Sequence, residues 1–263
     1  MASIREPLSF AGRTAFVTGA GGGMGRRIAE DLMALGADVA MYDVKPEPGD
    51  LKRGLGKALY VQGDLRDDKA VGRAMNAAFA LGGRLDYLAN VAGVLLFDRD
   101  GSAAEGKLEG WDLTMEINLK SLAYTVRHAV PYMRKGGGGA MVHVSSIQCM
   151  RGDPVPQDAY QASKAGVLAL SRSLAIQLGK QGIRSNAILP GVVRTPMQAR
   201  WDNDAATVTK IERLVPIGRI GTAEDISNLC LFLLSDLAGF ITGTEIVIDG
   251  GMMAMPAFMA AQP

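Results

Sequence analysis

The chain has 263 residues, of which 48% are hydrophobic and 21% charged, and its formal net charge is +1. This is the composition of an ordinary soluble globular protein, long enough for one large α/β domain or two small ones. No charged block predicts binding to nucleic acid or a membrane. The two cysteines, Cys149 and Cys230, lack a metal-type spacing, so no metal is predicted and a reduced cytoplasmic setting is the simplest interpretation.

The first predicted strand, Arg13 to Thr18, runs into a glycine-rich stretch and then into a helical pattern from Arg26 to Leu35. This order predicts the phosphate-binding turn of a dinucleotide fold, because the amides at the helix start and the helix dipole both face an anion. The spacing is Thr18-Gly19-x-x-x-Gly23-x-Gly25 rather than G-x-G-x-x-G. Glycines also serve plain turns, so the position between strand and helix is what favours a nucleotide.

A second predicted strand, Asp38 to Asp43, ends in an acidic residue. A carboxylate there can accept hydrogen bonds from ribose hydroxyls and would repel a 2′-phosphate. The glycine loop also contains no Lys or Arg before Arg26. We therefore predict NAD rather than NADP as the cofactor. The alternative is that Asp43 only caps the turn before Lys45.

The third predicted strand, Lys57 to Gln62, leads to Asp64, which is expected to contact the adenine amino group, to cap the helix Asp67 to Leu81, or both. The fourth, Leu85 to Asn90, is followed by Val91-Ala92-Gly93, small residues that let a cofactor approach the backbone. Leu95 to Gly110 is irregular. A long helical pattern, Trp111 to Arg134, then carries Asn118 on its apolar side, where a carboxamide must be hydrogen-bonded.

The next predicted strand, Ala140 to Val144, brings Ser146 to its carboxyl end, where open α/β sheets bind ligands. The helix that follows, Gln157 to Lys180, carries Tyr160 and Lys164 about one turn apart on one face. A phenol beside an ammonium group favours the phenolate, so Tyr160 is predicted to act as an acid and base near neutral pH. Tyr-x-x-x-Lys alone is common in helices; its place after strand and serine is what favours catalysis.

The chain closes with a strand from Ile183 to Leu189, a helix from Ala223 to Leu234 and a strand from Glu245 to Ile248. Between them, residues 194–214 are predicted to form a substrate lid, because they follow the carboxyl end of a strand; a surface excursion without a role is the alternative. Strands and helices alternate without a linker. The sequence therefore predicts one doubly wound α/β domain over residues 1–263, with a seven-stranded parallel sheet flanked by helices.

Taken together, these stretches resemble the short-chain dehydrogenase/reductases, in the compact single-domain branch with a Rossmann fold. The matching segments are Thr18-Gly-Ala-Gly-Gly-Gly-Met-Gly25, Asp64, Asn90-Val-Ala-Gly93, Asn118, Ser146, Tyr160-x-x-x-Lys164 and Pro190-Gly-Val-Val-Arg-Thr195. They follow the family's order over nearly the whole chain. One departure is Val91, where many members have a second asparagine.

The resemblance implies interconversion of a secondary alcohol and a ketone by hydride transfer, with Asn118, Ser146, Tyr160 and Lys164 as a catalytic tetrad. Tyr160 would exchange the substrate proton, Lys164 would lower its pKa and hold the nicotinamide ribose, Ser146 would bond the substrate oxygen, and Asn118 would hold a water. The implied cofactor contacts are Gly19, Gly23, Met24, Gly25, Asp43, Asp64, Leu65, Asn90, Ala92, Gly93, Tyr160, Lys164, Val193 and Thr195. The expected substrate contacts are Ser146, Gln148, Gln157, Tyr160, Met197 and Trp201.

Three other functions must be weighed against this one, and the resemblance also implies an oligomeric state. A 3-ketoacyl-carrier-protein reductase would usually prefer NADP and carry basic surface, against which Asp43 and Gln181 argue. An enoyl reductase would have Tyr-x6-Lys, and a nucleotide-sensing protein without activity would have lost Tyr160 or Lys164. The resemblance further implies a homotetramer, with Trp111–Arg134 and Gln157–Lys180 at one interface and the last helix and strand with Met252–Met259 at another.

Overall fold

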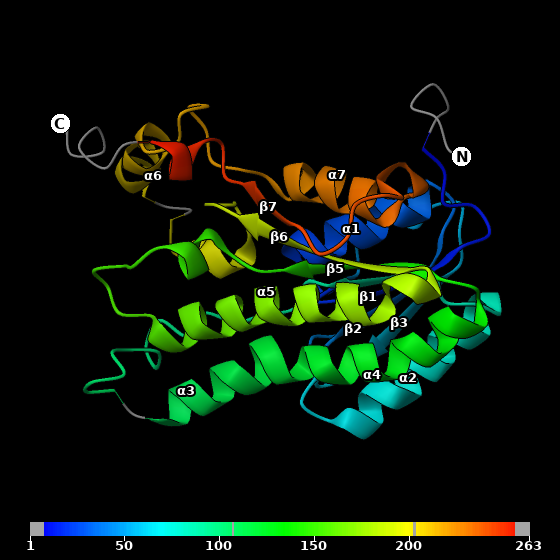
Figure 1. Ribbon diagram of the computed structural model, residues 1–263. Coiled ribbons are helices and arrows are strands. Elements are labelled where there is room, and N and C mark those ends of the chain that lie inside the picture. Colours follow the sequence, from blue (N-terminus) through cyan, green and yellow to red (C-terminus); the bar gives the residue numbers. More distant parts are fainter. Residues whose placement is uncertain (1–7, 107, 202–203, 256–263) are drawn as a thin grey trace.

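The computed structural model describes residues 8–106, 108–201 and 204–255 (Figure 1). At its centre lies a parallel sheet of seven strands in the order β3-β2-β1-β4-β5-β6-β7. The strands are β1 (Thr14–Thr18), β2 (Asp38–Asp43), β3 (Ala58–Gln62), β4 (Tyr87–Asn90), β5 (Gly139–Val144), β6 (Ile183–Pro190) and β7 (Glu245–Ile248). The predicted doubly wound sheet is therefore confirmed, and every predicted strand is present.

Helices cover both faces of this sheet. On one face α1 (Gly23–Ala34) packs against α7 (Ala223–Leu234), and on the other α2 (Asp68–Gly82), α4 (Ser121–Lys135) and α5 (Asp158–Leu178) form a second layer (Figure 1). The shorter helices are α3 (Leu108–Met115) and α6 (Ala205–Arg213). A hydrophobic core lies on each face of the sheet, and the strands contribute residues to both cores because a strand presents alternate side chains to opposite faces.

The chain reverses its direction of winding between β1 and β4. β1 pairs with both β2 and β4, so the loops that follow β1 and β4 leave the same edge of the sheet side by side. Thr18 fastens them together, because its hydroxyl accepts hydrogen bonds from Val91 N at 3.0 Å and Ala92 N at 3.2 Å. Ligands of open α/β sheets bind at such a switch point.

The predicted helix from Trp111 to Arg134 is not continuous. Between α3 and α4 lies a π-helical turn, Glu116–Lys120, with Asn118 at its centre. A π turn adds one residue to the helical repeat and changes which way its side chains face, and such turns are frequent at functional sites.

None of the helices in the described ranges is long and apolar enough to cross a membrane.

Candidate active site

The glycine-rich loop between β1 and α1 has the form required for close approach of a ligand. Gly19 and Gly23 have positive φ angles of 70° and 53°. A Cβ on Gly25 would lie 2.2 Å from the carbonyl oxygen of Gly19, so only glycine fits there. No side chain caps the first turn of α1, and no acidic residue lies in it. This leaves the amides and positive dipole end of α1 for an anion, as the diphosphate of a dinucleotide requires.

Asp43 has two hydrogen bonds at the end of β2. One carboxylate oxygen accepts from Gly21 N at 2.8 Å and the other from Lys45 N at 2.9 Å. Asp43 thus caps the turn before Lys45 and also holds the glycine loop, and its effect on cofactor choice stays a prediction. Arg26, the nearest cation along the loop, is engaged by Glu30 and Asp50 at 2.8 and 2.9 Å.

Asp64 does not cap the next helix, so that part of its prediction is wrong. The N-cap of α2 is Asp67, whose carboxylate accepts from Ala70 N at 3.0 Å. Asp64 instead pairs with Arg66, and this hydrogen-bonded ion pair lowers the pKa of Asp64. Of the acidic residues near this helix start, Asp64 lies too far upstream, and Asp67, which directly precedes α2, forms the cap. Leu65 between them is buried.

Asn90, at the end of β4, uses its side chain inside the protein. Its carboxamide oxygen accepts from the Thr125 hydroxyl at 2.8 Å, and its nitrogen lies 3.1 Å from His143 Nδ1. His143 Nε2 continues the chain of bonds to the Ser185 hydroxyl at 3.2 Å. This buried polar group ties α4, β4, β5 and β6 together beneath the predicted site. Any contact between Asn90 and a cofactor is left to its backbone.

Asn118 holds the loop that follows β4. Its oxygen accepts from Val94 N at 2.8 Å and its nitrogen donates to Val94 O at 2.9 Å and to the Ser163 hydroxyl at 3.1 Å. Its side chain is thus bound to protein on both ends. A Cβ on Gly93 would lie 3.0 Å from Lys164 Nζ and 3.3 Å from Asn118 Oδ1, so Gly93, Asn118 and Lys164 meet at one point.

Tyr160 and Lys164 lie on one face of α5, as predicted, with Lys164 Nζ 5.7 Å from the centre of the Tyr160 ring. Lys164 is buried and donates to Val144 O at 2.9 Å, which ties it to the end of β5. Ser146 follows that strand end, and its hydroxyl is hydrogen-bonded to Tyr160. The structure therefore brings Asn118, Ser146, Tyr160 and Lys164 together at the carboxyl end of the sheet.

The predicted pKa of Tyr160 near neutrality is wrong for the protein without ligand. Burial raises the pKa of the Tyr160 phenol, and its hydrogen bond with Ser146 opposes this only in part. Burial also lowers the pKa of Lys164, to about 8. Both shifts have one cause, because removal from water disfavours the charged form of each group. The phenol is therefore protonated at neutral pH in this state.

The predicted substrate contacts differ in what they offer a ligand. Gln148 is engaged at both ends of its amide, by Asp153 at 2.8 Å and Arg151 at 3.1 Å. Gln157 is buried, and its oxygen has no hydrogen-bond partner among the described residues. Met197 is partly exposed on the turn Pro196–Trp201. The side chain of Trp201 lies outside the described part of the chain.

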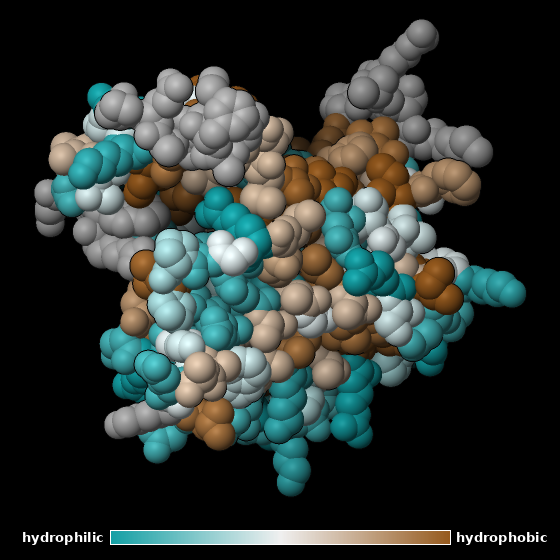
Figure 2. Space-filling model, turned by 60° about the vertical axis from the view of Figure 1, so that its left-hand side comes forward, coloured by the Kyte–Doolittle hydropathy of each residue, from teal (hydrophilic) through white to brown (hydrophobic). Residues whose placement is uncertain are grey.

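The segment predicted to form a lid begins over the glycine loop. Val193 is buried and forms a bridge with Gly221, and a Cβ on Gly23 would lie 3.4 Å from Thr195 Cβ. Thr195 thus sits against the loop expected to hold a diphosphate. The remainder of the predicted lid contains the turn Pro196–Trp201 and α6. Figure 2 brings the α6 end of the molecule forward and shows hydrophobic and hydrophilic residues interspersed over it.

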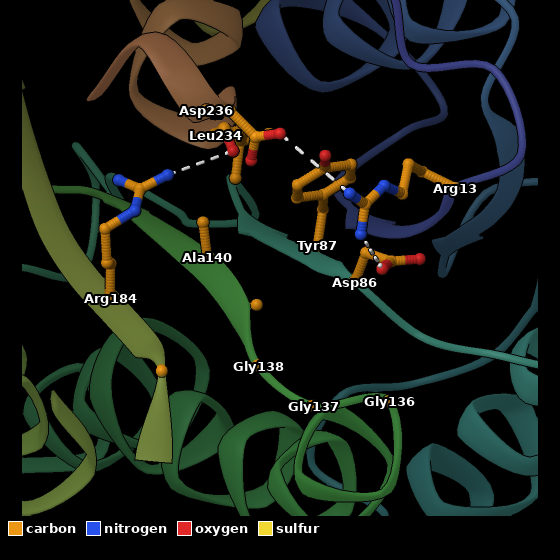
Figure 3. Close-up of a pocket in the computed structure, with 12 residues that line it drawn as sticks. Arg13, Asp86, Tyr87, Gly136, Gly137, Gly138, Ala140, Arg184, Leu234 and Asp236 are labelled. Atoms are coloured by element: carbon orange, nitrogen blue, oxygen red, sulfur yellow. Dashed lines mark hydrogen bonds and ion pairs between the residues drawn. The ribbon is translucent and has the colours of Figure 1, made fainter. Parts of the chain in front are cut away.

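A separate cavity of about 190 Å³ lies at the opposite, amino end of the strands (Figure 3). Its charged groups are satisfied by the protein. Asp86 accepts from Arg13 at 3.0 Å and is also paired with Arg84. Arg184 donates to the carbonyl groups of Leu233, Leu234 and Ser235 at the end of α7. These contacts close helix and strand ends, so we assign this cavity a structural role.

The comparisons with known proteins agree with this geometry. Residues 19–253 match the family described as enoyl-(acyl carrier protein) reductase. The chain is 36% identical over 251 residues to cis-4-hydroxycyclohexanecarboxylate dehydrogenase of Sinomonas cyclohexanicum, covering 94% of this chain and 99% of that protein. It is 35% identical over 249 residues to 2,5-dichloro-2,5-cyclohexadiene-1,4-diol dehydrogenase of Sphingobium indicum, covering 93% and 98%.

Solved structures give the same result. Levodione reductase superposes with a TM-score of 0.85 at 30% identity, over 94% of this chain and 100% of that chain. A putative 2-deoxy-D-gluconate 3-dehydrogenase from Agrobacterium tumefaciens, with bound NADP, superposes with a TM-score of 0.83 at 32% identity, over 95% and 100%. Fold and site define a nucleotide-binding oxidoreductase of the doubly wound class. The chain belongs to the short-chain dehydrogenase/reductase family.

Proposed function

We propose that this protein interconverts a cyclic secondary alcohol that bears a second polar group and the corresponding ketone, with NAD as the cofactor. The observation that carries the proposal is the meeting of Ser146, Tyr160 and Lys164 at the end of β5. Cyclic alcohols are named as substrates of two dehydrogenases similar to this chain. A bound nicotinamide would accept or supply the hydride.

The protein's own residues would handle the proton. In the direction of ketone reduction, the Tyr160 phenol donates its proton to the carbonyl oxygen, while Ser146 hydrogen-bonds that oxygen as its negative charge develops. In alcohol oxidation, the phenolate takes the proton of the hydroxyl group. Lys164 favours the phenolate by its charge and binds the nicotinamide ribose. Asn118 keeps the loop at Val94 in place beside both groups.

The pKa directions predict opposite pH preferences for the two reactions. Burial raises the pKa of Tyr160, so the phenol stays protonated at neutral pH. Reduction needs the protonated form and should be fastest at neutral pH, whereas oxidation needs the phenolate and should accelerate as the pH rises above neutrality. Initial rates in both directions, measured with cofactor and substrate at saturation across the pH range, test this.

The polar part of the proposed substrate would bind at Gln157. Its buried amide oxygen has no partner among the residues that the structure describes, and an unsatisfied buried acceptor costs about 1–3 kcal/mol unless a ligand or water supplies a donor. Gln157 precedes Tyr160 by three residues, about one helical turn, so it lies near the reacting end of α5. Cyclic diols and hydroxy acids should therefore have higher kcat/KM than cyclohexanol, and Gln157→Leu should remove that preference. Equal values for the wild-type protein would contradict the proposed substrate class.

The preference for NAD rests on Asp43 and Arg26. Asp43 places a carboxylate beside the glycine loop, and Arg26 is neutralised by Glu30 and Asp50 instead of facing a phosphate. A 2′-phosphate would meet like charge, at a cost of a few kcal/mol, on the order of a hundredfold in affinity. We expect kcat/KM with NADP to be lower by about that factor. Asp43→Ala should narrow the gap, although NAD binding also weakens because Gly21 loses its partner.

One alternative substrate has a specific observation in its favour. The family matched by residues 19–253 is described by a carrier-linked activity. A 3-ketoacyl-carrier-protein reductase would reduce acetoacetyl thioesters with NADPH faster than cyclic ketones with NADH. A direct comparison of these two reactions by cofactor absorbance distinguishes the two functions.

We further propose that four copies assemble through the two predicted interfaces. The π turn and α5 line a groove of about 620 Å³ whose residues are Asp112, Met115, Glu116, Leu119, Lys120, Ala123, Gly166 and Leu170. Near β7, Phe232, Phe240 and Val247 are exposed, while Met252 and Met253 pack on their own chain. The tail from residue 256 lies outside the described residues. Light scattering at micromolar concentration should give the mass of a tetramer.

A further inference from the structure

The first turn of α5, which carries Tyr160, is held by a carboxylate from another part of the chain. Asp100 lies in the irregular segment after β4, and only 7% of its surface is exposed. Its two oxygens accept hydrogen bonds from Ala159 N at 3.1 Å and Tyr160 N at 2.8 Å. These amides belong to the first turn of α5, whose N-cap residue, Gln157, makes no side-chain cap.

The contact is reciprocal. Asp158, the first residue of α5, accepts from Ala103 N at 2.8 Å through its carboxylate, and its own amide lies 3.4 Å from Gly101 O. Four hydrogen bonds thus join residues 100–103 to residues 158–160, and we refer to this group as the α5 clasp. A clasp built from both segments fixes their relative position, whereas a single cap would fix only the helix end.

The clasp completes a ring of contacts around Tyr160. The carbonyl group of Tyr160 accepts from the Ser163 hydroxyl at 2.8 Å, and Ser163 in turn accepts from Asn118. Asn118 binds both backbone groups of Val94. Asn118 therefore holds the start of the segment at Val94, and the backbone amide of Tyr160 holds its end at Asp100.

From this geometry we propose that Asp100 is a positioning residue for the proton-transfer step, which fixes Tyr160 relative to Asn118 and couples the segment 94–103 to the catalytic helix. The inference rests on the proposed function. A shift of about 1 Å in a reacting group can lower the rate by roughly a hundredfold. An anchor on the Tyr160 backbone amide limits such shifts, because this amide belongs to the residue that carries the reacting phenol.

The decisive variant is Asp100→Asn. Asparagine caps helices about as well as aspartate, so a residue that only caps would tolerate the change. Two acceptor oxygens are nevertheless needed for the amides of Ala159 and Tyr160, and the carboxamide has one. We expect the melting temperature of Asp100→Asn to stay within about 3 °C of the wild type, in the range of a cap exchange. Its kcat should fall by about tenfold or more, with an increased primary deuterium isotope effect and an unchanged dissociation constant for NAD.

Asp67→Ala is the matched control. Asp67 caps α2 through Ala70 N at 3.0 Å, and it belongs to no part of the proposed tetrad or clasp. It should lower stability by about 1 kcal/mol and leave kcat unchanged. Asp100→Ala should lower kcat more than Asp100→Asn does. If Asp100→Asn keeps the wild-type kcat and isotope effect, Asp100 is only a cap and the proposal is overturned.

Two further measurements keep the test independent of folding and of the proposed function. If Asp100→Ala does not fold, Asp158→Ala breaks the clasp at Ala103 and should lower kcat severalfold. Hydrogen exchange needs no substrate: in Asp100→Asn, exchange should accelerate in both segments, 94–103 and 158–160, and in neither for Asp67→Ala. Absence of turnover in the wild type with every alcohol would refute the proposed function, while unchanged exchange in Asp100→Asn would refute the clasp.

Discussion

The two ends of the central sheet use polar residues in opposite ways. At the amino end, charged groups neutralise one another: Asp86 is paired with Arg13 and Arg84, and Arg184 closes the last turn of α7. Within the described part of the chain, the carboxyl end differs: Lys164 is buried without a carboxylate partner, no side chain caps the first turn of α1, and the Gln157 oxygen has no hydrogen-bond partner. The buried Thr14 hydroxyl at the amino end also lacks a partner among the described residues, but the charged groups there are paired, whereas the buried cation and the free helix end at the carboxyl end indicate where a ligand completes the structure.

The largest effect on kcat is expected at the carboxyl end, and it can be measured by removing one tyrosine hydroxyl group from each end of the sheet. Tyr160→Phe removes the proposed proton donor and should lower kcat by about a thousandfold or more, with the dissociation constant for NAD largely kept. Tyr87→Phe removes a hydroxyl from a residue that lines the amino-end cavity and should leave kcat unchanged. If the two variants had comparable kcat, the assignment of catalysis to the carboxyl end and of a structural role to the amino end would be contradicted.

The reverse experiment removes the central charge of the amino end. Asp86 is buried, with 3% of its side chain exposed, and receives two arginines and the amide of Thr14 at 2.9 Å. Asp86→Ala should cost about 3 kcal/mol of unfolding free energy, because it leaves the amide and the cations without their partner. Denaturant titration measures this loss, and KM for substrate should not change. A large rise in KM would show that the two ends are coupled.

The sequence predicted the fold because its signals are local. Each strand is a short apolar run, and Gly19, Gly23 and Pro190 mark the places where the chain must turn or stop. Three residues of the tetrad were equally accessible, since Tyr160 and Lys164 lie one turn apart on a helix and Ser146 follows a strand. The role of Asn118 was predicted only from the family resemblance.

What the sequence did not reveal depends on contacts between distant segments. Asp100 looks like any acidic residue in a polar loop, and only the folded chain places it at the amides of Ala159 and Tyr160. The pKa of Tyr160 was predicted from one neighbour, whereas burial, a property of the whole fold, dominates. The π turn around Asn118, whose side chain binds Val94, was likewise not predicted from the sequence.

His143 offers the smallest and most specific test, because it lies beneath the carboxyl end within the fully bonded group of Asn90 and Ser185. The Asn90 nitrogen can only donate, so His143 Nδ1 accepts and Nε2 carries the proton that faces Ser185. A second proton would have no acceptor there. Burial accordingly lowers the pKa of His143 from 6.5 to about 4.

This shift makes stability depend on pH in a defined direction. Between pH 6.5 and about 4 the unfolded chain binds a proton at His143 that the folded protein does not, so unfolding becomes more favourable as the pH falls. From pH 7 to pH 5 the loss should be roughly 2 kcal/mol, given about 1.4 kcal/mol for each pKa unit. His143→Asn removes the titrating group while keeping a carboxamide that can bond with Asn90 or Ser185, so its unfolding free energy should fall by less over this range. Parallel pH dependence of the wild type and His143→Asn in denaturant titrations would mean that another group is responsible. The folded protein itself binds this proton only near pH 4, so protonation of His143 should not change kcat between pH 7 and pH 5, where stability already falls.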